Sequence, residues 1–249
     1  MAAPVEHLSA LHPIASALLY RETGDPFAGE GPARKTLRLG FSSSLSWGFL
    51  RELVRRYRTL PDAVALSFVD RSASEVLRAV RRGEIDAGFV QEATDVGRLN
   101  VEELWRERAM VALAANHPLA GDNEITGEAL RGERFIAAGK PADRDRHVRL
   151  IEAAIGEPPA ALNLYPVERE TLVNLVGLGF GVALITGSTM GAFYPNVVYL
   201  PVAGSPASVA FHLVSRPDSH NPELGALLAT ARALAVRWAH DPVYASFHR

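Results

Sequence analysis

The chain has 249 residues, of which 48% are hydrophobic and 22% are charged, which is typical of an ordinary globular protein. Its formal net charge of −2 provides no global field that would draw it to nucleic acid or to an anionic membrane. It contains no cysteine, so disulfides, thiolate zinc sites and cysteine nucleophiles are excluded. Neither a secretory signal nor an apolar run of about 18 residues occurs. We therefore expect a cytoplasmic protein.

Residues 1–36 differ in pattern from the rest of the chain. A short helix is predicted over His7–Tyr20, and the glycines and prolines between Gly24 and Pro32 would end any continuation. We expect this segment to be a leader or a linker remnant, and residues 241–249 to be a C-terminal tail.

From Leu37 onward the pattern predicts alternating strands and helices. The expected elements are, in order, the strand Leu37–Phe41, the amphipathic helix Trp47–Leu60, the strand Val64–Val69, a helix capped by Ser72 or Ser74 that stops at Gly83, and the strand Ile85–Val90. This order implies parallel strands joined by right-handed crossovers.

The second half of the chain contains a similar arrangement. The expected elements are the strand Met110–Ala114, a turn at 116–119, a short helix at 126–130, the strand Phe135–Ala137, the helix Asp143–Ile155, an extended run Leu162–Val167, the helix Glu170–Leu178, the strands Gly181–Ile185, Val197–Pro201 and Val209–Ser215, and the closing helix Pro222–Trp238. The helices that stop at Gly83 and Gly179 each lead into a buried apolar strand. Two such units predict a two-lobed α/β protein that binds a small molecule between its lobes.

Hydroxyl-rich segments follow the first two predicted strands. In an open parallel sheet, ligands bind beyond the carboxyl ends of the strands. There Ser42–Ser44 and Ser72–Ser74 offer hydroxyls beside helix N-termini, which suit a carboxylate or another small anion. Plain helix capping is the alternative for each cluster. The complete set of candidate ligand-binding residues is Ser42, Ser43, Ser44, Ser72, Ser74, Gln91, Glu92, Lys140, Arg144 and Thr186.

The remaining candidates come from less specific patterns. Gln91, Glu92 and Thr186 follow strands and would face the same gap between the lobes, although such residues are also ordinary in loops. Lys140 and Arg144 lie at the start of a helix, where they would either reach an anionic ligand or remain solvated surface charges.

No motif indicates catalysis or a bound metal or cofactor. The chain has no H-E-x-x-H sequence and no G-x-S-x-G elbow. The glycines Gly177, Gly179 and Gly181 follow a helix and precede a strand, which is the reverse of a dinucleotide-binding loop. We expect them to end the helix and allow tight packing. The sequence therefore predicts a binding protein rather than an enzyme.

The order of the segments is that of a known family. The chain contains, in order, LRLGFSSSLSWGFLRELVRRYRTLPDAVALSF, SASEVLRAVRRGEIDAGFV, LWRERAMVALAANHPLA and ETLVNLVGLGFGVALI. The most specific parts are Gly-Glu-Ile-Asp at 83–86, His-Pro-Leu-Ala at 117–120 and the block Gly177–Ile185. Over about residues 37–238 the chain resembles the effector-binding domain of LysR-type transcriptional regulators.

This resemblance implies two Rossmann-like lobes joined by two crossing segments, similar to type 2 periplasmic binding proteins. One lobe would comprise about 37–111 plus 194–240, and the other about 112–193. An inducer, often a small carboxylate or aromatic acid, would bind between them. Ser42–Ser44 and Ser72–Ser74 match the positions at which the family usually contacts its ligand. The resemblance also implies a homodimer that pairs side by side through the helix Trp47–Leu60 and its counterpart in the other lobe.

One large difference from the family concerns DNA binding. The family places a winged helix-turn-helix and a long linker helix before this domain, and residues 1–36 are too few to contain them. We expect that this chain alone does not bind DNA specifically.

Two other classes of protein share the expected fold. A solute-binding protein for a transporter is the first, although such a protein would be exported and no signal segment is visible. Bilobal enzymes such as porphobilinogen deaminases and prephenate dehydratases are the second. The deaminases hold their cofactor on a cysteine, which is absent here, and the Thr-Arg-Phe run of the dehydratases is also absent.

Overall fold

The computed structural model describes residues 35–91, 96–219 and 221–238. Nearly all of the predicted leader, the C-terminal tail and the candidate residue Glu92 lie outside these ranges. The described residues from Thr36 onward belong to one compact unit.

The first part of this unit contains the predicted parallel strand–helix–strand–helix–strand order. Its elements are β1 (Thr36–Phe41), α2 (Phe49–Tyr57), β2 (Ala65–Asp70), α3 (Ala73–Arg82) and β3 (Ala87–Gln91). Strand β1 pairs in parallel with β2 on one side and with β3 on the other. The prediction for this region is confirmed.

Helix α2 is shorter at both ends than predicted, and the backbone explains both differences. Gly48 precedes the helix with a φ of 86°, a left-handed conformation that cannot continue an α-helix. At the other end, the N–H of Thr59 bonds to the carbonyl of Arg56 rather than one residue further back. This tighter turn ends the helix before Leu60. Leu60 precedes Pro61, and a residue before a proline disfavours the helical conformation.

Strand β4 (Asn100–Ala114) is the longest strand described, and it begins ten residues before the predicted start at Met110. Residues 100–108 pair antiparallel with β10 (Ser208–Ser215), which also pairs antiparallel with β3. We refer to β1, β2, β3, β10 and residues 100–108 of β4 as the first strand group. The sheet is mixed, because β10 lies between β3 and β4 and runs antiparallel to both, whereas β1, β2 and β3 are parallel.

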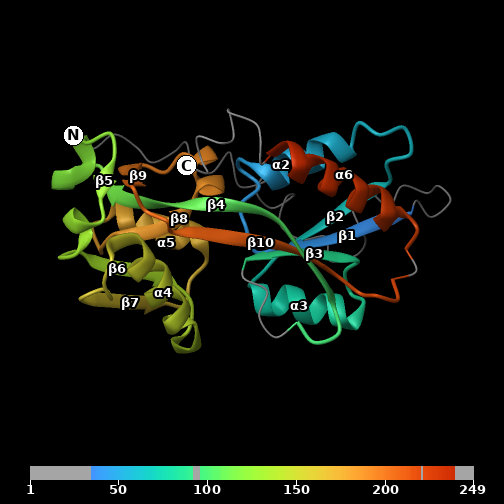
Figure 1. Cartoon of the computed structure of the whole chain (residues 1–249), viewed down its shortest axis with the longest axis horizontal. Coiled ribbons are helices and arrows are strands. Elements are labelled where there is room, and N and C mark those ends of the chain that lie inside the picture. Colours follow the sequence, from blue (N-terminus) through green and yellow to red (C-terminus); the bar gives the residue numbers. More distant parts are fainter. Residues whose placement is uncertain (1–34, 92–95, 220, 239–249) are drawn as a thin grey trace, which may run out of the picture. The chain divides into compact units, whose positions relative to one another are not determined.

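The remaining residues of β4, 109–114, belong to a second strand group. The other members are β5 (Ile125–Thr126), β6 (Arg134–Ala138), β7 (Ala161–Tyr165), β8 (Ala183–Thr186) and β9 (Val197–Ala203). Strands β8 and β9 both pair antiparallel with β4, and β6 pairs in parallel with β7. A bridge between Phe135 and Val182 connects β6 to the residue just before β8. Figure 1 shows β4 running as one green arrow through both groups.

Helices cover both faces of each group and give each group its own core. In Figure 1, α2 and α6 (Glu223–Trp238) lie together on one side of the first group and α3 lies on the other. Phe49 and Leu227 are buried on the side of α2 and α6, and Val76 and Val80 on the α3 side. In the second group, helices α4 (Arg144–Ile155) and α5 (Arg169–Gly177) supply separate clusters.

Trp105 of β4 is the central aromatic residue of the first core. Its ring stacks on Phe49 of α2 at 4.3 Å and on Phe211 of β10 at 4.6 Å between centroids. Stacked aromatic contacts of this kind add about 0.5–1.5 kcal/mol beyond the area they bury. They fix α2 against the strand that both groups share.

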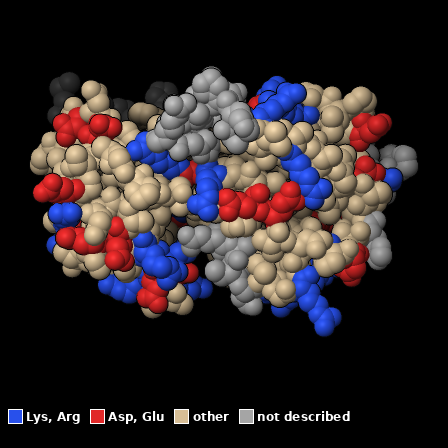
Figure 2. All heavy atoms as spheres, in the orientation of Figure 1, with Lys and Arg blue, Asp and Glu red and all other residues tan. Residues whose placement is uncertain are grey.

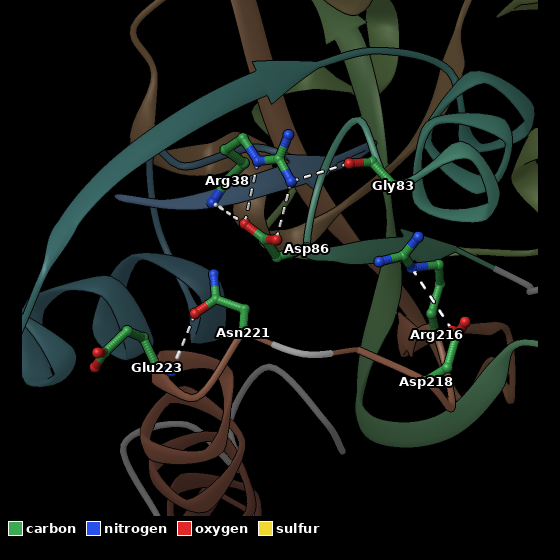
Figure 3. Close-up of polar contacts among 7 residues, drawn as sticks. All are labelled: Arg38, Gly83, Asp86, Arg216, Asp218, Asn221 and Glu223. Carbon is green, nitrogen blue, oxygen red and sulfur yellow. Dashed lines mark hydrogen bonds and ion pairs between the residues drawn. The ribbon is translucent and has the colours of Figure 1, made fainter. Parts of the chain in front are cut away.

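The Gly-Glu-Ile-Asp motif has a structural role at the amino end of β1. Gly83 ends α3 in the left-handed conformation, with a φ of 71°. The carboxylate of Asp86 accepts hydrogen bonds from the backbone N–H of Arg38 at 2.7 Å and from its guanidinium at 3.1 Å, as Figure 3 shows. Partial burial raises the pKa of Asp86, but the hydrogen bonds from Arg38 outweigh it and lower the pKa overall. The motif therefore joins α3 and β3 to β1.

Glycines allow close packing where α5 leads into β8. A Cβ atom on Gly177 would lie 2.9 Å from the carbonyl oxygen of Pro195, and one on Gly181 would lie 2.4 Å from that of Arg134. Gly179 has a φ of 80°. The prediction that these glycines end the helix and permit tight packing is confirmed.

Charge is well mixed on the surface drawn in Figure 2. Lys and Arg atoms alternate there with Asp and Glu atoms, and the described atoms on that face form no extended region of one sign. This distribution agrees with the near-zero net charge of the sequence.

Candidate functional site

The loop after β1 is anchored to the end of β3. The backbone N–H of Ser42 donates to the carbonyl of Phe89 at 3.0 Å, and the hydroxyl of Ser42 accepts from the N–H of Gln91 at 3.4 Å. The predicted positions Ser42 and Gln91 therefore lie together at the carboxyl end of two adjacent parallel strands. Glu92 follows Gln91 outside the described residues.

Ser43 is the most unusual of the predicted residues. It is only 1% exposed, and its hydroxyl has no hydrogen-bond partner among the described residues. Leaving such a group unpaired costs about 1–3 kcal/mol, and most buried polar groups are paired. Ser44 differs, since its hydroxyl lies 2.8 Å from that of Ser46 and accepts from the N–H of the same residue.

The cluster after β2 is used for helix capping. Ser72 and Glu75 form a reciprocal capping box at the start of α3, and the hydroxyl of Ser72 donates to the Glu75 carboxylate at 2.6 Å. This bond from Ser72 lowers the pKa of Glu75. The hydroxyl of Ser74 lies 3.3 Å from that of Ser72, and both residues are exposed. The structure thus gives Ser72 the capping role that was one of its two alternatives.

The two predicted cations lie on exposed positions of the second group. The backbone N–H of Lys140 donates to the carboxylate of Asp143 at 2.8 Å. The guanidinium of Arg144 donates to the carbonyl of Leu162 at 3.1 Å, within its own strand group. Neither contact brings these residues to the loop after β1.

Thr186 belongs to a buried polar network that joins the two strand groups. Its hydroxyl lies 3.1 Å from that of Ser188, in the short turn η4 (Gly187–Gly191). The N–H of Ser188 donates to Glu107 of β4 at 2.8 Å, and its carbonyl accepts from the hydroxyl of Ser46 at 2.6 Å. Glu107 is 6% exposed and also accepts the indole N–H of Trp105 at 2.9 Å. These bonds hold η4 against the segment that precedes α2.

Arg169, which the sequence did not single out, makes a second contact between the groups. It begins α5, and its guanidinium donates to the carbonyl of Ser42 at 3.1 Å. Partial burial raises the pKa of Asp70, at the end of β2; the charge of Arg169 lowers it and that of Glu168 raises it. The carboxyl ends of β1, β2 and β3 therefore face the start of α5. An Arg within the run Glu168–Glu170 was the only signal, and such runs usually indicate a solvated face.

No group of three or more His, Asp or Glu side chains in the described ranges is arranged to hold a metal ion. None of the helices in those ranges is both long enough and apolar enough to cross a bilayer. His117 is a turn residue, as expected, since its Nδ1 accepts the N–H of Leu119 at 3.2 Å.

Comparison with known proteins identifies the family. Residues 30–235 match the sequence profile of the LysR substrate binding domain. The Hca operon transcriptional activator HcaR of Escherichia coli K12 is 27% identical over 197 residues, which cover 78% of this chain and 66% of HcaR. The chain thus spans just under two thirds of the length of this relative.

Two solved structures share the fold. The BenM effector binding domain with its effector benzoate has a TM-score of 0.67 at 24% identity, covering 83% of this chain and 94% of that one. The effector binding domain of QuiR in complex with shikimate has a TM-score of 0.69 at 18% identity, covering 82% and 99%. The fold is therefore the one expected, similar to type 2 periplasmic binding proteins. The chain belongs to the LysR substrate binding domain family.

Proposed function

We propose that this chain senses a small carboxylate for a LysR-type transcriptional regulator, and that the ligand binds where the loop after β1 meets the start of α5. The observation that carries this proposal is the convergence of Ser42, the buried hydroxyl of Ser43 and the guanidinium of Arg169 on one loop. A buried hydroxyl and a guanidinium are both suited to a carboxylate oxygen. Benzoate and shikimate, found in two proteins of the same fold, are both carboxylates.

The lobes of the proposed sensor correspond to the two strand groups except at β9 and residues 109–111, which these lobe bounds assign to the first lobe although they pair within the second group. One lobe would comprise about 37–111 plus 194–240, the other about 112–193, and the ligand would change how they meet. A ligand shifts such an equilibrium only through its different affinities for the two arrangements. Contacts that cross between the groups, such as those of Arg169 and Ser188, are the ones such a change would alter.

A thermal-shift screen with benzoate, shikimate, salicylate and acetate tests this proposal. A ligand present at 100 times its dissociation constant adds about 2.7 kcal/mol to the free energy of unfolding. We expect at least one of these carboxylates to stabilise the protein, and Ser43→Ala to weaken its binding at least tenfold. Ser67→Ala, an exposed position of β2, is the matched control and should bind like the wild type. If none of the four stabilises the wild type, the proposed ligand class is wrong.

We also propose that the chain forms a cytoplasmic homodimer. Strand β2 ends the strand order, so one of its edges has no partner strand in the described chain. Phe68 on this strand is 42% exposed, and Trp47, just before α2, is also 42% exposed. Exposed edges that carry large apolar side chains are commonly covered by another chain.

Sedimentation velocity would test the dimer. Phe68→Lys should shift the protein towards the monomer, whereas Val101→Lys, at a site of similar exposure on β4, should not. Equal behaviour of the two variants would place the interface elsewhere. We further propose that this chain alone does not bind DNA specifically, so a sub-micromolar mobility shift at physiological salt would contradict the proposal.

A further inference from the structure

Arg169 occupies a place in the fold where a structural cation is not expected. It is the first residue of α5, and the N-terminus of a helix carries a partial positive charge. A cation there is unfavourable by a few tenths to about 1 kcal/mol. Positions of this kind attract anions instead.

The partner of Arg169 in the chain is weaker than the partner a guanidinium prefers. Its hydrogen bond goes to a neutral carbonyl, that of Ser42, at 3.1 Å. Among the described residues, no carboxylate forms an ion pair with Arg169, although its charge acts on the carboxyl of Asp70. A guanidinium binds a carboxylate through two parallel charge-assisted hydrogen bonds, each about twice as strong as a neutral one.

A second, independent observation lies one residue along the same loop. Ser43 is 1% exposed and its hydroxyl has no partner among the described residues. A hydroxyl donates one hydrogen bond and accepts others, so it can donate to a carboxylate oxygen, and it belongs to the loop whose Ser42 carbonyl Arg169 contacts. The loop thus combines a guanidinium from the second strand group with a hydroxyl from the first.

We propose that, when the ligand binds, the guanidinium of Arg169 breaks its hydrogen bond to the carbonyl of Ser42 and bonds to the carboxylate of the ligand instead. Arg169 thereby makes binding depend on the negative charge of the ligand and changes the contact between the strand groups. This inference rests on the proposed function and names the residue that carries its specificity. The ligand would strengthen the bonding of Arg169 in one arrangement of the groups and not in the other, which is the condition for shifting their equilibrium.

The acidic neighbours narrow the class of ligand. The charges of Arg169 and Glu168 both act on the carboxyl of Asp70, and those of Arg169 and Glu170 both act on the hydroxyl of Tyr194. One carboxylate on the ligand can pair with the guanidinium, but a second would meet these negative charges. The site therefore fits a monocarboxylate better than a dicarboxylate.

The test uses probes that differ only in charge. Benzoate, neutral benzamide and dianionic phthalate are titrated by calorimetry, with shikimate as a second monocarboxylate. The proteins are the wild type, Arg169→Gln, Arg169→Lys and the control Arg131→Gln, whose guanidinium also donates to a backbone carbonyl, that of Ile155, at 3.2 Å. Ligand-free melting temperatures report on folding.

We expect the wild type to bind a monocarboxylate at least tenfold more tightly than benzamide or phthalate. Arg169→Gln should weaken that binding at least tenfold and abolish the preference for charge, while Arg169→Lys should retain part of both because it keeps the charge but loses the fork. The ligand-free melting temperature of Arg169→Gln should change by less than about 3 °C, and Arg131→Gln should bind as the wild type does.

Each alternative result is decisive. If Arg169→Gln binds the monocarboxylate with wild-type affinity while Ser43→Ala does not, the role of Arg169 is refuted and the proposed function stands. If the wild type binds benzamide or phthalate as tightly as benzoate, charge reading is refuted. If neither benzoate nor shikimate binds the wild type, this inference fails, and a response to salicylate or acetate in the thermal-shift screen decides whether the proposed function fails with it.

Discussion

Gly191 permits a close approach of backbone segments between the two strand groups. It is the last residue of η4, and a Cβ atom added there would lie 2.4 Å from the carbonyl oxygen of Ser46, 2.6 Å from its carbonyl carbon and 2.8 Å from the Cβ of Trp47. Ordinary van der Waals contact for a Cβ begins at 3.4 Å. Gly191→Ala would therefore force the two segments about 1 Å apart, because backbone atoms cannot rotate away.

The cost of this displacement has two parts. Overpacking of this kind costs about 1–3 kcal/mol. The displacement also lengthens the bond from the Ser46 hydroxyl to the Ser188 carbonyl, now 2.6 Å, and a hydrogen bond contributes about 1 kcal/mol. We expect Gly191→Ala to lower the free energy of unfolding by about 3 kcal/mol, which corresponds to about 6–12 °C in the melting temperature.

The sign of the effect makes the experiment decisive. Gly→Ala at an unstrained position normally stabilises a protein by about 0.4–1 kcal/mol. Gly121, where an added Cβ would meet nothing within 4 Å, provides the matched control. Urea unfolding of both variants, analysed by linear extrapolation, measures the difference. If Gly191→Ala is as stable as Gly121→Ala, the two segments do not approach each other as described.

Three further predictions concern buried or paired side chains. Burial lowers the pKa of His147 to about 4, so the stability that the neutral imidazole confers is complete above pH 6.5 and is lost as the pH falls towards 4. Between pH 7.5 and pH 5 the wild type should lose about 2 kcal/mol more than His147→Gln, and equal shifts of the urea midpoint in the two proteins would contradict this. Arg55 and Arg56 hold the pKa of Glu52 at about 2, although the solvent exposure of these arginines limits how much the ion pairs stabilise the fold. Glu52→Gln should therefore lower the free energy of unfolding, measured in urea, by about 1 kcal/mol at pH 7 and by progressively less as the pH falls from 4.5 towards 2. Trp105→Phe keeps an aromatic ring but leaves an oxygen of buried Glu107 without its donor, so calorimetry should show a loss of about 2 kcal/mol, and an unchanged melting temperature would show that this bond is dispensable.

The parallel unit at the start of the domain was predictable because its signals are local. Apolar spacing defined α2 and α3, Ser72 and Glu75 form a capping box three residues apart, and Gly83 supplies the left-handed stop. Each of these signals depends on residues within one or two turns of each other. Short-range patterns of this kind are preserved when the chain folds.

The parts that were not predicted depend on contacts distant in sequence. Residues 100–108 of β4 carry several charged side chains and form a strand because β10 pairs with them. Glu102 there bonds Arg232 of α6, 130 residues away. The same holds for the candidate site, where Arg169 meets Ser42 across 127 residues. No local pattern distinguishes such an arginine from a solvated one.

The continuity of β4 through both strand groups has a consequence for engineering. Cutting the chain between residues 108 and 109 would leave β10 without β3 and residues 100–108, the backbone it pairs with on both sides, and would expose apolar strand edges that promote aggregation. Neither half is therefore a module that can be transplanted alone. A chimera intended to transfer ligand preference between relatives should exchange the whole span from β1 to α6, with its hybrid junctions placed outside it.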